Sequence, residues 1–257
     1  MQSTVVPSLI SPEELAALLE NPLDLIVLDV SPTSNKSGLQ TAHPGLQIPG
    51  ARKADLKAQF SDPDRPWPNT VPIAAAFSHA AQALGVNHES RVVVYDNLGI
   101  YSAPRLWWLF RSMGHQQVSV LDGGLPAWIA AGLPTSPQEE NNNYEAGNFE
   151  ASLDEASVWS RDQVTANLAA PKALVIDARS AGRFAGTAAE PRIGLPSGHI
   201  PASCSLPFKS VLQGMKMKSK EELTQLFAEL ELGDQPLVFS CGSGLTACIT
   251  LLAADQV

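Results

Sequence analysis

The chain is poor in cysteine, in basic residues and in charge of either sign. Its 257 residues include three widely spaced cysteines, an odd number that does not suit a disulfide framework and favours free thiols in a reducing compartment. Asp and Glu number 26 against 17 Lys and Arg, which gives a net charge of −9. This balance argues against nucleic acid or an anionic membrane as a partner, because both attract basic surfaces.

Long apolar runs are also missing. No stretch reaches the roughly 18 consecutive apolar residues of a membrane span, and the N-terminal residues lack the basic region and apolar core of a signal peptide. Together with the free thiols, this predicts a cytoplasmic protein with no membrane partner. Cys and His spacing suggests no zinc site, and Gly-rich phosphate or dinucleotide loops are absent, so we expect no metal and no cofactor.

Helix and strand signals alternate along the first half of the chain. Ser11-Pro12-Glu13-Glu14 is typical of a capped helix start, with Glu14 three residues after the cap. The mainly apolar run at 25–30 indicates a strand buried on both faces, further strands are expected at 91–95 and 118–121, and helices are expected between them. This order predicts an α/β fold in which helices flank a mainly parallel sheet.

The second half repeats the plan of the first. Leu174–Asp177 matches Ile26–Asp29, and Leu237–Ser240 matches Val92–Tyr95, with a helix expected near 219–231. We therefore predict two tandem copies of one α/β unit, a repeat far longer than that of a solenoid. The predicted organisation is a first domain at 1–137, a polar linker at 138–157 and a second domain at 158–257.

The second copy is shorter than the first. In the first copy, 32 residues separate Asp96 from Trp128, and the same step from Cys241 passes the last residue, Val257. We expect the last strand and helix of the second domain to be absent from this sequence, as in a truncated or incomplete chain, because a sheet that lacks a strand exposes an edge.

The most informative stretch is 240–248, which joins an apolar strand to a predicted helix. Cys241 follows the strand directly, at the sheet edge where ligands bind in open α/β folds. Gly242 and Gly244 allow the loop to curl so that backbone N–H groups converge as an anion-binding nest. The nest and the helix dipole both favour a thiolate, so Cys241 is a candidate nucleophile.

A cysteine-led loop between strand and helix also occurs in phosphatases. Those enzymes need an arginine six residues after the cysteine to hold phosphate oxygens, and Ala247 stands there in this chain. Phosphate-ester hydrolysis would therefore lack its main electrostatic element.

Motifs in both halves accompany the Cys241 loop. They are Asp177-Ala178-Arg179, Gly182-Arg183-Phe184, Glu190-Pro191-Arg192, Gly198-His199-Ile200-Pro201, Pro207-Phe208, Ile48-Pro49-Gly50-Ala51, Ser102-Ala103-Pro104-Arg105 and Leu121-Asp122-Gly123-Gly124-Leu125-Pro126-Ala127-Trp128. In these segments the chain resembles the tandem-domain sulfurtransferases of the rhodanese family, most of all those that act on 3-mercaptopyruvate. The likeness covers essentially the whole chain.

The resemblance implies a reaction with a small-molecule sulfur donor. Cys241 takes sulfur from 3-mercaptopyruvate, pyruvate leaves, and a thiol such as that of a thioredoxin, or cyanide, accepts the sulfur from the Cys241 persulfide. Arg183 and Arg192 would bind the carboxylate and carbonyl of the 2-keto acid, for which guanidinium groups are suited. Ser243 would hydrogen-bond either the thiolate or the carbonyl oxygen of the donor.

Backbone N–H groups of the same loop would stabilise charge on sulfur. They belong to Gly242, Ser243, Gly244, Leu245 and Thr246. For Thr246, a helix cap and catalytic support are equally weighted alternatives.

The loop also bears on the choice of donor. Thiosulfate is a dianion, and relatives specific for it carry basic residues after the cysteine, whereas Gly242 and Ser243 are neutral. This favours 3-mercaptopyruvate over the alternative of a thiosulfate sulfurtransferase. A non-catalytic binding module built on the same fold is the remaining alternative.

Five other polar residues receive no catalytic role. Asp96 stands where the first copy would need its nucleophile, so that copy is expected to be inactive, and Gln47 replaces a histidine that relatives place in a relay. His199 is expected to stabilise a turn, Cys248 to pack beneath the Cys241 loop, and Cys204 to be a buried apolar residue.

Overall fold

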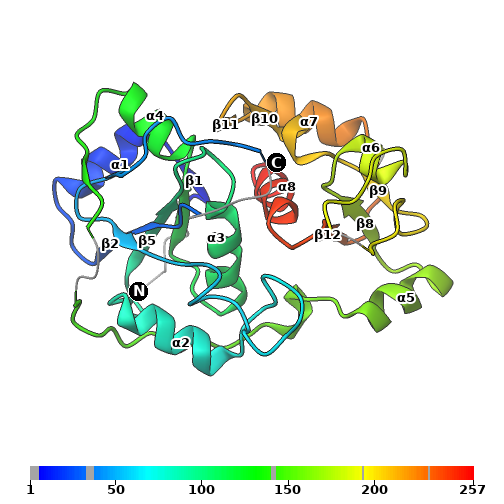
Figure 1. Ribbon diagram of the computed structural model, residues 1–257, viewed down its shortest axis with the longest axis horizontal. Coiled ribbons are helices and arrows are strands. Elements are labelled where there is room, and N and C mark those ends of the chain that lie inside the picture. The colour runs from blue at the N-terminus through cyan, green and yellow to red at the C-terminus, as the bar shows by residue number, and fades with distance from the viewer. Residues whose placement is uncertain (1–5, 33–37, 140–142, 193, 231) are drawn as a thin grey trace. The chain divides into compact units, whose positions relative to one another are not determined.

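Parallel β-sheets form the centre of both halves of the chain. The structure, a computed structural model, describes residues 6–32, 38–139, 143–192, 194–230 and 232–257 (Figure 1). The chain divides into one unit of residues 1–154 with 214–216 and another of residues 155–213 with 217–257. None of the helices within the described ranges is both long enough and apolar enough to cross a membrane.

The sheet of the first unit has five parallel strands. Their order is β1 (Leu9–Ile10), β6 (Val118–Leu121), β5 (Arg91–Tyr95), β2 (Leu25–Asp29) and β4 (Arg52–Lys53). The central strands β2, β5 and β6 are almost entirely buried. Their apolar runs are therefore covered on both faces, as the sequence predicts.

The first unit has four helices in the part of the chain that the structure describes, and the first begins at its predicted position after Ser11. They are α1 (Pro12–Leu19), α2 (Ala74–Ala83), α3 (Ala103–Ser112) and α4 (Gly124–Ala130). At the start of α1, Ser11 Oγ accepts the N–H of Glu14 at 3.1 Å, and the Glu14 carboxylate accepts the N–H of Ser11 at 2.7 Å. This reciprocal pair satisfies two N–H groups that a helix start otherwise leaves free.

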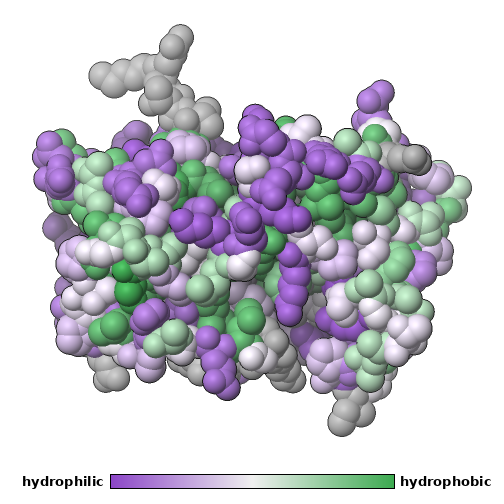
Figure 2. Space-filling model, turned by 90° about the horizontal axis from the view of Figure 1, so that it is seen from above, coloured by the Kyte–Doolittle hydropathy of each residue, from purple (hydrophilic) through white to green (hydrophobic). Residues whose placement is uncertain are grey.

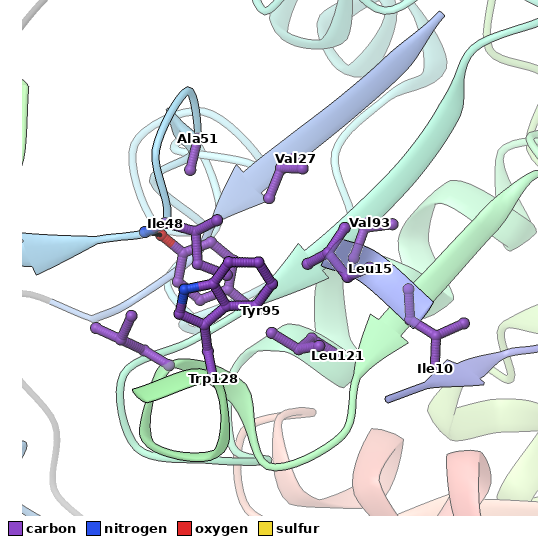
Figure 3. Close-up of a cluster of buried hydrophobic side chains, with 10 residues drawn as sticks. Ile10, Leu15, Val27, Ile48, Ala51, Val93, Tyr95, Leu121 and Trp128 are labelled. Atoms are coloured by element: carbon purple, nitrogen blue, oxygen red, sulfur yellow. Dashed lines mark hydrogen bonds between the residues drawn. The ribbon is translucent and has the colours of Figure 1, made fainter. Parts of the chain in front are cut away.

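The helices pack on both faces of this sheet because successive strand residues point to opposite faces. On one face, Val93 and Tyr95 of β5 pack with Leu15 of α1 and Trp128 of α4, as Figure 3 shows. On the other face, rings from α2, α3 and the connecting segments form an aromatic cluster of Phe60, Phe77, Phe110 and Phe149.

The predicted linker at 138–157 contains a segment that is firmly attached to the first unit. Phe149 belongs to the aromatic cluster, and its N–H donates to the carbonyl of Val86 at 3.1 Å. Further along, Ser152 N–H donates to Met113 O at 3.0 Å and Asp154 N–H to Ser112 O at 2.8 Å. Residues 147–154 therefore form an ordered strap rather than a free tether.

The second unit holds a parallel sheet in the order β12 (Leu237–Ser240), β8 (Leu174–Asp177) and β9 (Cys204–Ser205). In this register Ser240, Asp177 and Ser205 lie side by side at the carboxyl edge. Its helices are α5 (Arg161–Ala169), α6 (Ala181–Phe184), α7 (Lys220–Ala228) and α8 (Thr246–Ala254). Capping boxes start α5 at Ser160 and α7 at Ser219.

Smaller elements complete the two units. They are the antiparallel pair β3 (Leu46–Gln47) and β7 (Ser136–Pro137), the pair β10 (Leu212–Gln213) and β11 (Lys216–Met217), and the 3-10 turns η1 (Glu155–Ser157) and η2 (Phe208–Val211). The turn η2 packs on α8, and its Val211 is fully buried. It therefore helps to hold the helix that follows Cys241.

The two sheets differ at corresponding strands. In the first unit, β5 lies between β6 and β2 and is almost wholly buried, whereas β12 in the second unit is half-exposed along its whole length. Within the described residues, no strand flanks β12 on the side away from β8. In the part of the chain that the structure describes, the second sheet is therefore shorter than the first.

Hydrophilic and hydrophobic residues are interspersed on the face seen in Figure 2. The large apolar side chains that are exposed come from separate segments of the chain, namely Leu23, Trp67, Ile73, Leu168, Leu195, Met215 and Val257. Single exposed apolar residues of this kind are ordinary for a folded protein.

Candidate active site

Cys241 lies directly after β12, and the residue is half-buried. The loop 241–245 leads from the carboxyl edge of the parallel sheet into α8, the red helix of Figure 1. The backbone N–H of Gly244 donates to Cys241 Sγ over 3.1 Å. The sulfur is therefore placed at the N-terminal end of a helix, where negative charge is stabilised.

Gly244 makes this geometry possible. Its φ of +77° lies in the left-handed region, which favours glycine. On its other side, the Gly244 carbonyl accepts the thiol of Cys248 at 3.2 Å. Cys248 is 5% exposed on α8, so it packs beneath the loop as predicted.

The start of α8 excludes one of the two predicted roles of Thr246, that of the helix cap. The N-cap residue is Leu245, which has no side chain that can accept a backbone N–H, and Thr246 is the first helical residue. Thr246 is thus not the helix cap. Its N–H is one of those at the helix start that have no partner within the helix.

Arg183 lies against the Cys241 loop. It is near the end of α6, and a Cβ atom placed on Gly242 would lie only 2.8 Å from its Nη2. The space beside Gly242 is therefore filled by a guanidinium group. A side chain at position 242 would have to displace it.

A chain of alternating charges holds Arg183 in this place. Arg183 donates from Nε to Glu190 Oε1 at 3.0 Å and from Nη2 to Glu190 Oε2 at 2.5 Å. Arg179 donates from Nη1 to the same Glu190 Oε1 at 2.9 Å and from Nη2 to Asp177 Oδ2 at 2.5 Å. Hydrogen bonding from Arg183 lowers the pKa of Glu190, and hydrogen bonding to Asp177 raises the pKa of Arg179.

Arg192 lies in the same loop as Glu190 and is half-buried. Its side chain has no ion pair with any carboxylate in the described part of the chain. The nearby Gly198 is fixed because its carbonyl accepts Arg179 Nη2 at 2.7 Å.

His199 makes two contacts with Phe184. Its Nδ1 lies 2.8 Å from the Phe184 carbonyl oxygen, and its ring stacks on the Phe184 ring. These contacts hold the turn together, which is the structural role that the sequence predicts for His199.

The first unit has a loop of the same type after β5. In this loop the backbone N–H groups bind the side chain of one of the loop's own residues, Asp96. Asp96 is fully buried and accepts four backbone N–H groups, from Leu98, Tyr101, Ser102 and Ala103, over 2.7–3.0 Å. Burial raises the pKa of Asp96, while these hydrogen bonds act in the opposite direction. The nest that precedes α3 is therefore filled by the carboxylate of Asp96 itself.

Gln47 is a structural residue of the first unit. It is 2% exposed, donates from Nε2 to Ala51 O at 3.3 Å and accepts the N–H of Glu139 at Oε1 over 3.3 Å. Both ends of its amide are therefore used to join backbone segments. An amide has no basic nitrogen, so no proton relay passes through this position.

The remaining cysteine departs from its prediction. Cys204 is half-buried on β9 rather than fully buried, because β9 is the edge strand of its sheet. Partial burial raises the pKa of its thiol. All three cysteines are free thiols, and no cluster of His, Cys, Asp or Glu in the described ranges could hold a metal ion.

The sequence motifs that contain Glu190 and Arg179 predict no role for either residue. The structure makes Glu190 the carboxylate that joins the two arginines, seven and eleven residues away along the chain. The signal in the sequence was the presence of a single glutamate in a loop rich in Gly, Pro and Arg. Nothing in that spacing identifies which arginine it pairs with.

A half-buried cysteine lies at the carboxyl edge of a parallel sheet, with a Gly-rich turn and a helix after it, in a protein of the α/β class. A family model described as a rhodanese-like domain matches residues 11–131 and 160–256, and the chain belongs to this family. The two matched segments confirm the predicted tandem domains.

Curated relatives include sulfurtransferases of three names. The 3-mercaptopyruvate sulfurtransferase of Mus musculus is 43% identical over 212 residues, which cover 80% of this chain and 70% of the relative. The thiosulfate/3-mercaptopyruvate sulfurtransferase 1, mitochondrial, of Arabidopsis thaliana is 38% identical over 272 residues, covering 96% and 71%. The thiosulfate sulfurtransferase of Cricetulus griseus is 39% identical over 213 residues, covering 80% and 70%.

Solved structures agree with this assignment. SseA from Escherichia coli, described among the 3-mercaptopyruvate sulfotransferases, superposes with a TM-score of 0.83 at 30% identity, covering 97% of this chain and 94% of that one. The Tum1 protein of Saccharomyces cerevisiae gives a TM-score of 0.84 at 28% identity, covering 97% and 89%. The predicted α/β fold with a parallel sheet flanked by helices is thus confirmed.

Proposed function

We propose that this protein is a sulfurtransferase that moves sulfane sulfur from 3-mercaptopyruvate through a persulfide on Cys241 to a thiol or cyanide, with release of pyruvate. The observation that carries the proposal is the half-buried Cys241 Sγ, which accepts the N–H of Gly244 at the start of α8 beside the Arg183 guanidinium. A structural cysteine needs neither access nor such an anion-stabilising setting.

The reaction is neutral in redox terms. The Cys241 thiolate attacks the donor sulfur, an S–S bond forms, and the C–S bond of 3-mercaptopyruvate breaks with its electron pair left on carbon. The resulting enolate of pyruvate takes up a proton and leaves. An acceptor thiolate then attacks the outer sulfur of the persulfide, which restores the Cys241 thiolate and leaves a persulfide on the acceptor.

Each predicted site residue has a part in this reaction. Arg183 and Arg192 bind the carboxylate and carbonyl oxygens of the donor, because a guanidinium offers several N–H donors in a planar fork. Ser243 hydrogen-bonds the sulfur or the donor carbonyl. Backbone N–H groups in the loop stabilise the charge on sulfur, from Gly242, Gly244, Leu245 and Thr246.

The acceptor is a small thiol, a thioredoxin-type dithiol or cyanide, each of which is a nucleophile that can attack the outer sulfur of a persulfide. We propose a cytoplasmic location, which the three free cysteines support because free thiols suit a reducing compartment. Cell fractionation tests this location, and recovery in an organelle matrix would reject it.

The decisive experiment is intact mass measurement of the purified protein after incubation with 3-mercaptopyruvate, with pyruvate measured in the same sample. We expect a mass gain of one sulfur atom and release of pyruvate. Cys241→Ser abolishes both, whereas Cys204→Ser, which removes the other half-buried thiol, retains both. Absence of a sulfur adduct on the wild-type protein would instead favour a non-catalytic module.

Thiosulfate sulfurtransferase is the second candidate function, because relatives of that name match this chain almost as well. The neutral Gly242 and Ser243 next to Cys241 disfavour a dianionic donor. Comparison of kcat/KM for the two donors separates the candidates. Turnover of thiosulfate without turnover of 3-mercaptopyruvate would select the second.

A further inference from the structure

Glu190 occupies a position that neither its motif nor the proposed chemistry explains. Its side chain is 3% exposed, and the guanidinium groups of Arg179 and Arg183 both donate to it. A carboxylate with so little exposed surface needs partners to offset its lost hydration, and here both partners are cations.

The pair with Arg183 is side-on. Glu190 takes the Nε–H and one Nη2–H of Arg183, at 3.0 and 2.5 Å. An arginine has five N–H donors in a fixed plane, so three remain for a carboxylate or carbonyl oxygen. Because Glu190 binds one edge of the planar guanidinium, it fixes the direction in which the other edge points.

Glu190 is itself held in place by a second arginine, Arg179. Arg179 binds it from Nη1 at 2.9 Å while its Nε and Nη2 engage the Asp177 carboxylate at 2.5–3.0 Å. Asp177 is the last residue of β8, which pairs with β12 next to Cys241. The chain of charges therefore runs from the edge of the sheet to the guanidinium beside Gly242.

We propose that Glu190 is a positioning residue for sulfur-donor binding, which acts by fixing the Arg183 guanidinium against the Cys241 loop. This rests on the proposed function, in which Arg183 binds the donor carboxylate. Free arginine side chains sample many rotamers, and a fixed fork loses less entropy when the donor binds. The contrasting possibility is that Glu190 only lowers the positive charge of the site.

The test compares Glu190→Gln with Asp234→Asn, which removes one negative charge from an exposed position of the same unit. We expect Glu190→Gln to raise the KM for 3-mercaptopyruvate about tenfold while kcat changes less than about threefold. Asp234→Asn leaves both unchanged. Glu190→Asp is too short to reach both arginines and raises KM in the same direction.

A double-mutant cycle with Arg183→Met asks whether Glu190 acts through Arg183. In the Arg183→Met background, Glu190→Gln should change KM by less than about twofold. An equal factor in both backgrounds, or an unchanged KM in the single variant, overturns the proposal. A wild-type protein with no turnover at all would instead reject the proposed function.

Alkylation of Cys241 gives a readout that needs no turnover. Iodoacetate has a carboxylate that a fixed Arg183 can guide, whereas iodoacetamide is neutral. We expect Glu190→Gln to lower the ratio of their rate constants at Cys241 about threefold, with Asp234→Asn as the control. A purely electrostatic role predicts a higher ratio, because a negative charge is removed, and that result overturns the proposal.

Discussion

The backbone N–H of Gly244 points at Cys241 Sγ, 3.1 Å away, and it does so from a left-handed residue with a φ of +77°. Gly244→Ala adds a Cβ to that strained conformation and should cost about 1–2 kcal/mol of stability. Relief of the strain turns the N–H away from the sulfur, so we expect a loss of at least about tenfold in the rate of persulfide formation. Stopped-flow measurement of pyruvate release tests this.

Gly242→Ala is the matched control for that substitution and should fail in a different way. Gly242 has no left-handed φ, but its added Cβ would meet Arg183 Nη2. We expect a higher KM for 3-mercaptopyruvate with a smaller change in kcat. If the two alanine variants change KM and kcat in the same way, the prediction that the two glycines have separate roles is wrong.

Cys248 should matter for catalysis although it lies beneath the reacting sulfur. Its thiol donates to the Gly244 carbonyl at 3.2 Å, which fixes the peptide whose N–H faces Cys241. Cys248→Ala should cost about 1–2 kcal/mol of stability and slow persulfide formation several-fold. Cys248→Ser keeps a donor and should stay within about twofold of the wild-type rate. Equal rates for both variants would show that the Cys248 thiol does not contribute to persulfide formation.

Sequence patterns predicted the regular elements of this protein well. Leu174–Asp177 and Leu237–Ser240 are strands with the predicted bounds, and the predicted cap at Ser11 starts α1. These features depend on neighbouring residues, which is why local patterns suffice. The nucleophile loop was predictable for the same reason, because its glycines, strand and helix are contiguous.

Long-range contacts were not predictable in this way. Phe149 packs with Phe77 and Phe110, far away along the chain, and nothing in the polar stretch around it indicates a strap. The pairing of Glu190 with two arginines and the half-exposure of Cys204 at a sheet edge depend on tertiary structure in the same way.

Asp96 should be a major source of stability in the first unit. Its carboxylate accepts four buried N–H groups, and Asp96→Ala leaves them without an acceptor. We expect the free energy of unfolding of the first unit to fall by about 3 kcal/mol or more. This lowers the melting temperature of that unit by about 6–12 °C. Persulfide formation on Cys241 should persist wherever the variant remains folded, because Cys241 belongs to the second unit.

Asp55→Ala is the control for that variant. Asp55 also accepts two backbone N–H groups, from Lys57 and Ala58, but at an exposed site where water can replace the carboxylate. Its loss should cost only about 1 kcal/mol. Equal destabilisation by the two variants would contradict the view that Asp96 fills a buried anion site.

Stability should fall in acid at two points, one for each unit. Burial lowers the pKa of His115 below its usual 6.5, and its Nε2 is 2.9 Å from Ser90 O inside the aromatic cluster. The unfolded chain therefore takes up this proton first, so the first unit loses stability as pH falls below about 6.5. The hydrogen bonds from Arg183 lower the pKa of Glu190 below 4.5, so its contribution is present above that pH and is lost as pH falls further.

Thermal melts between about pH 7 and pH 3 test both assignments. His115→Phe, which keeps an aromatic ring, should flatten the decline that begins near pH 6.5, and Glu190→Gln should flatten the decline below about pH 4.5. Each substitution should leave the other window unchanged, because the two residues lie in different units. A wild-type acid response that neither variant alters would show that other carboxylates govern the loss of stability.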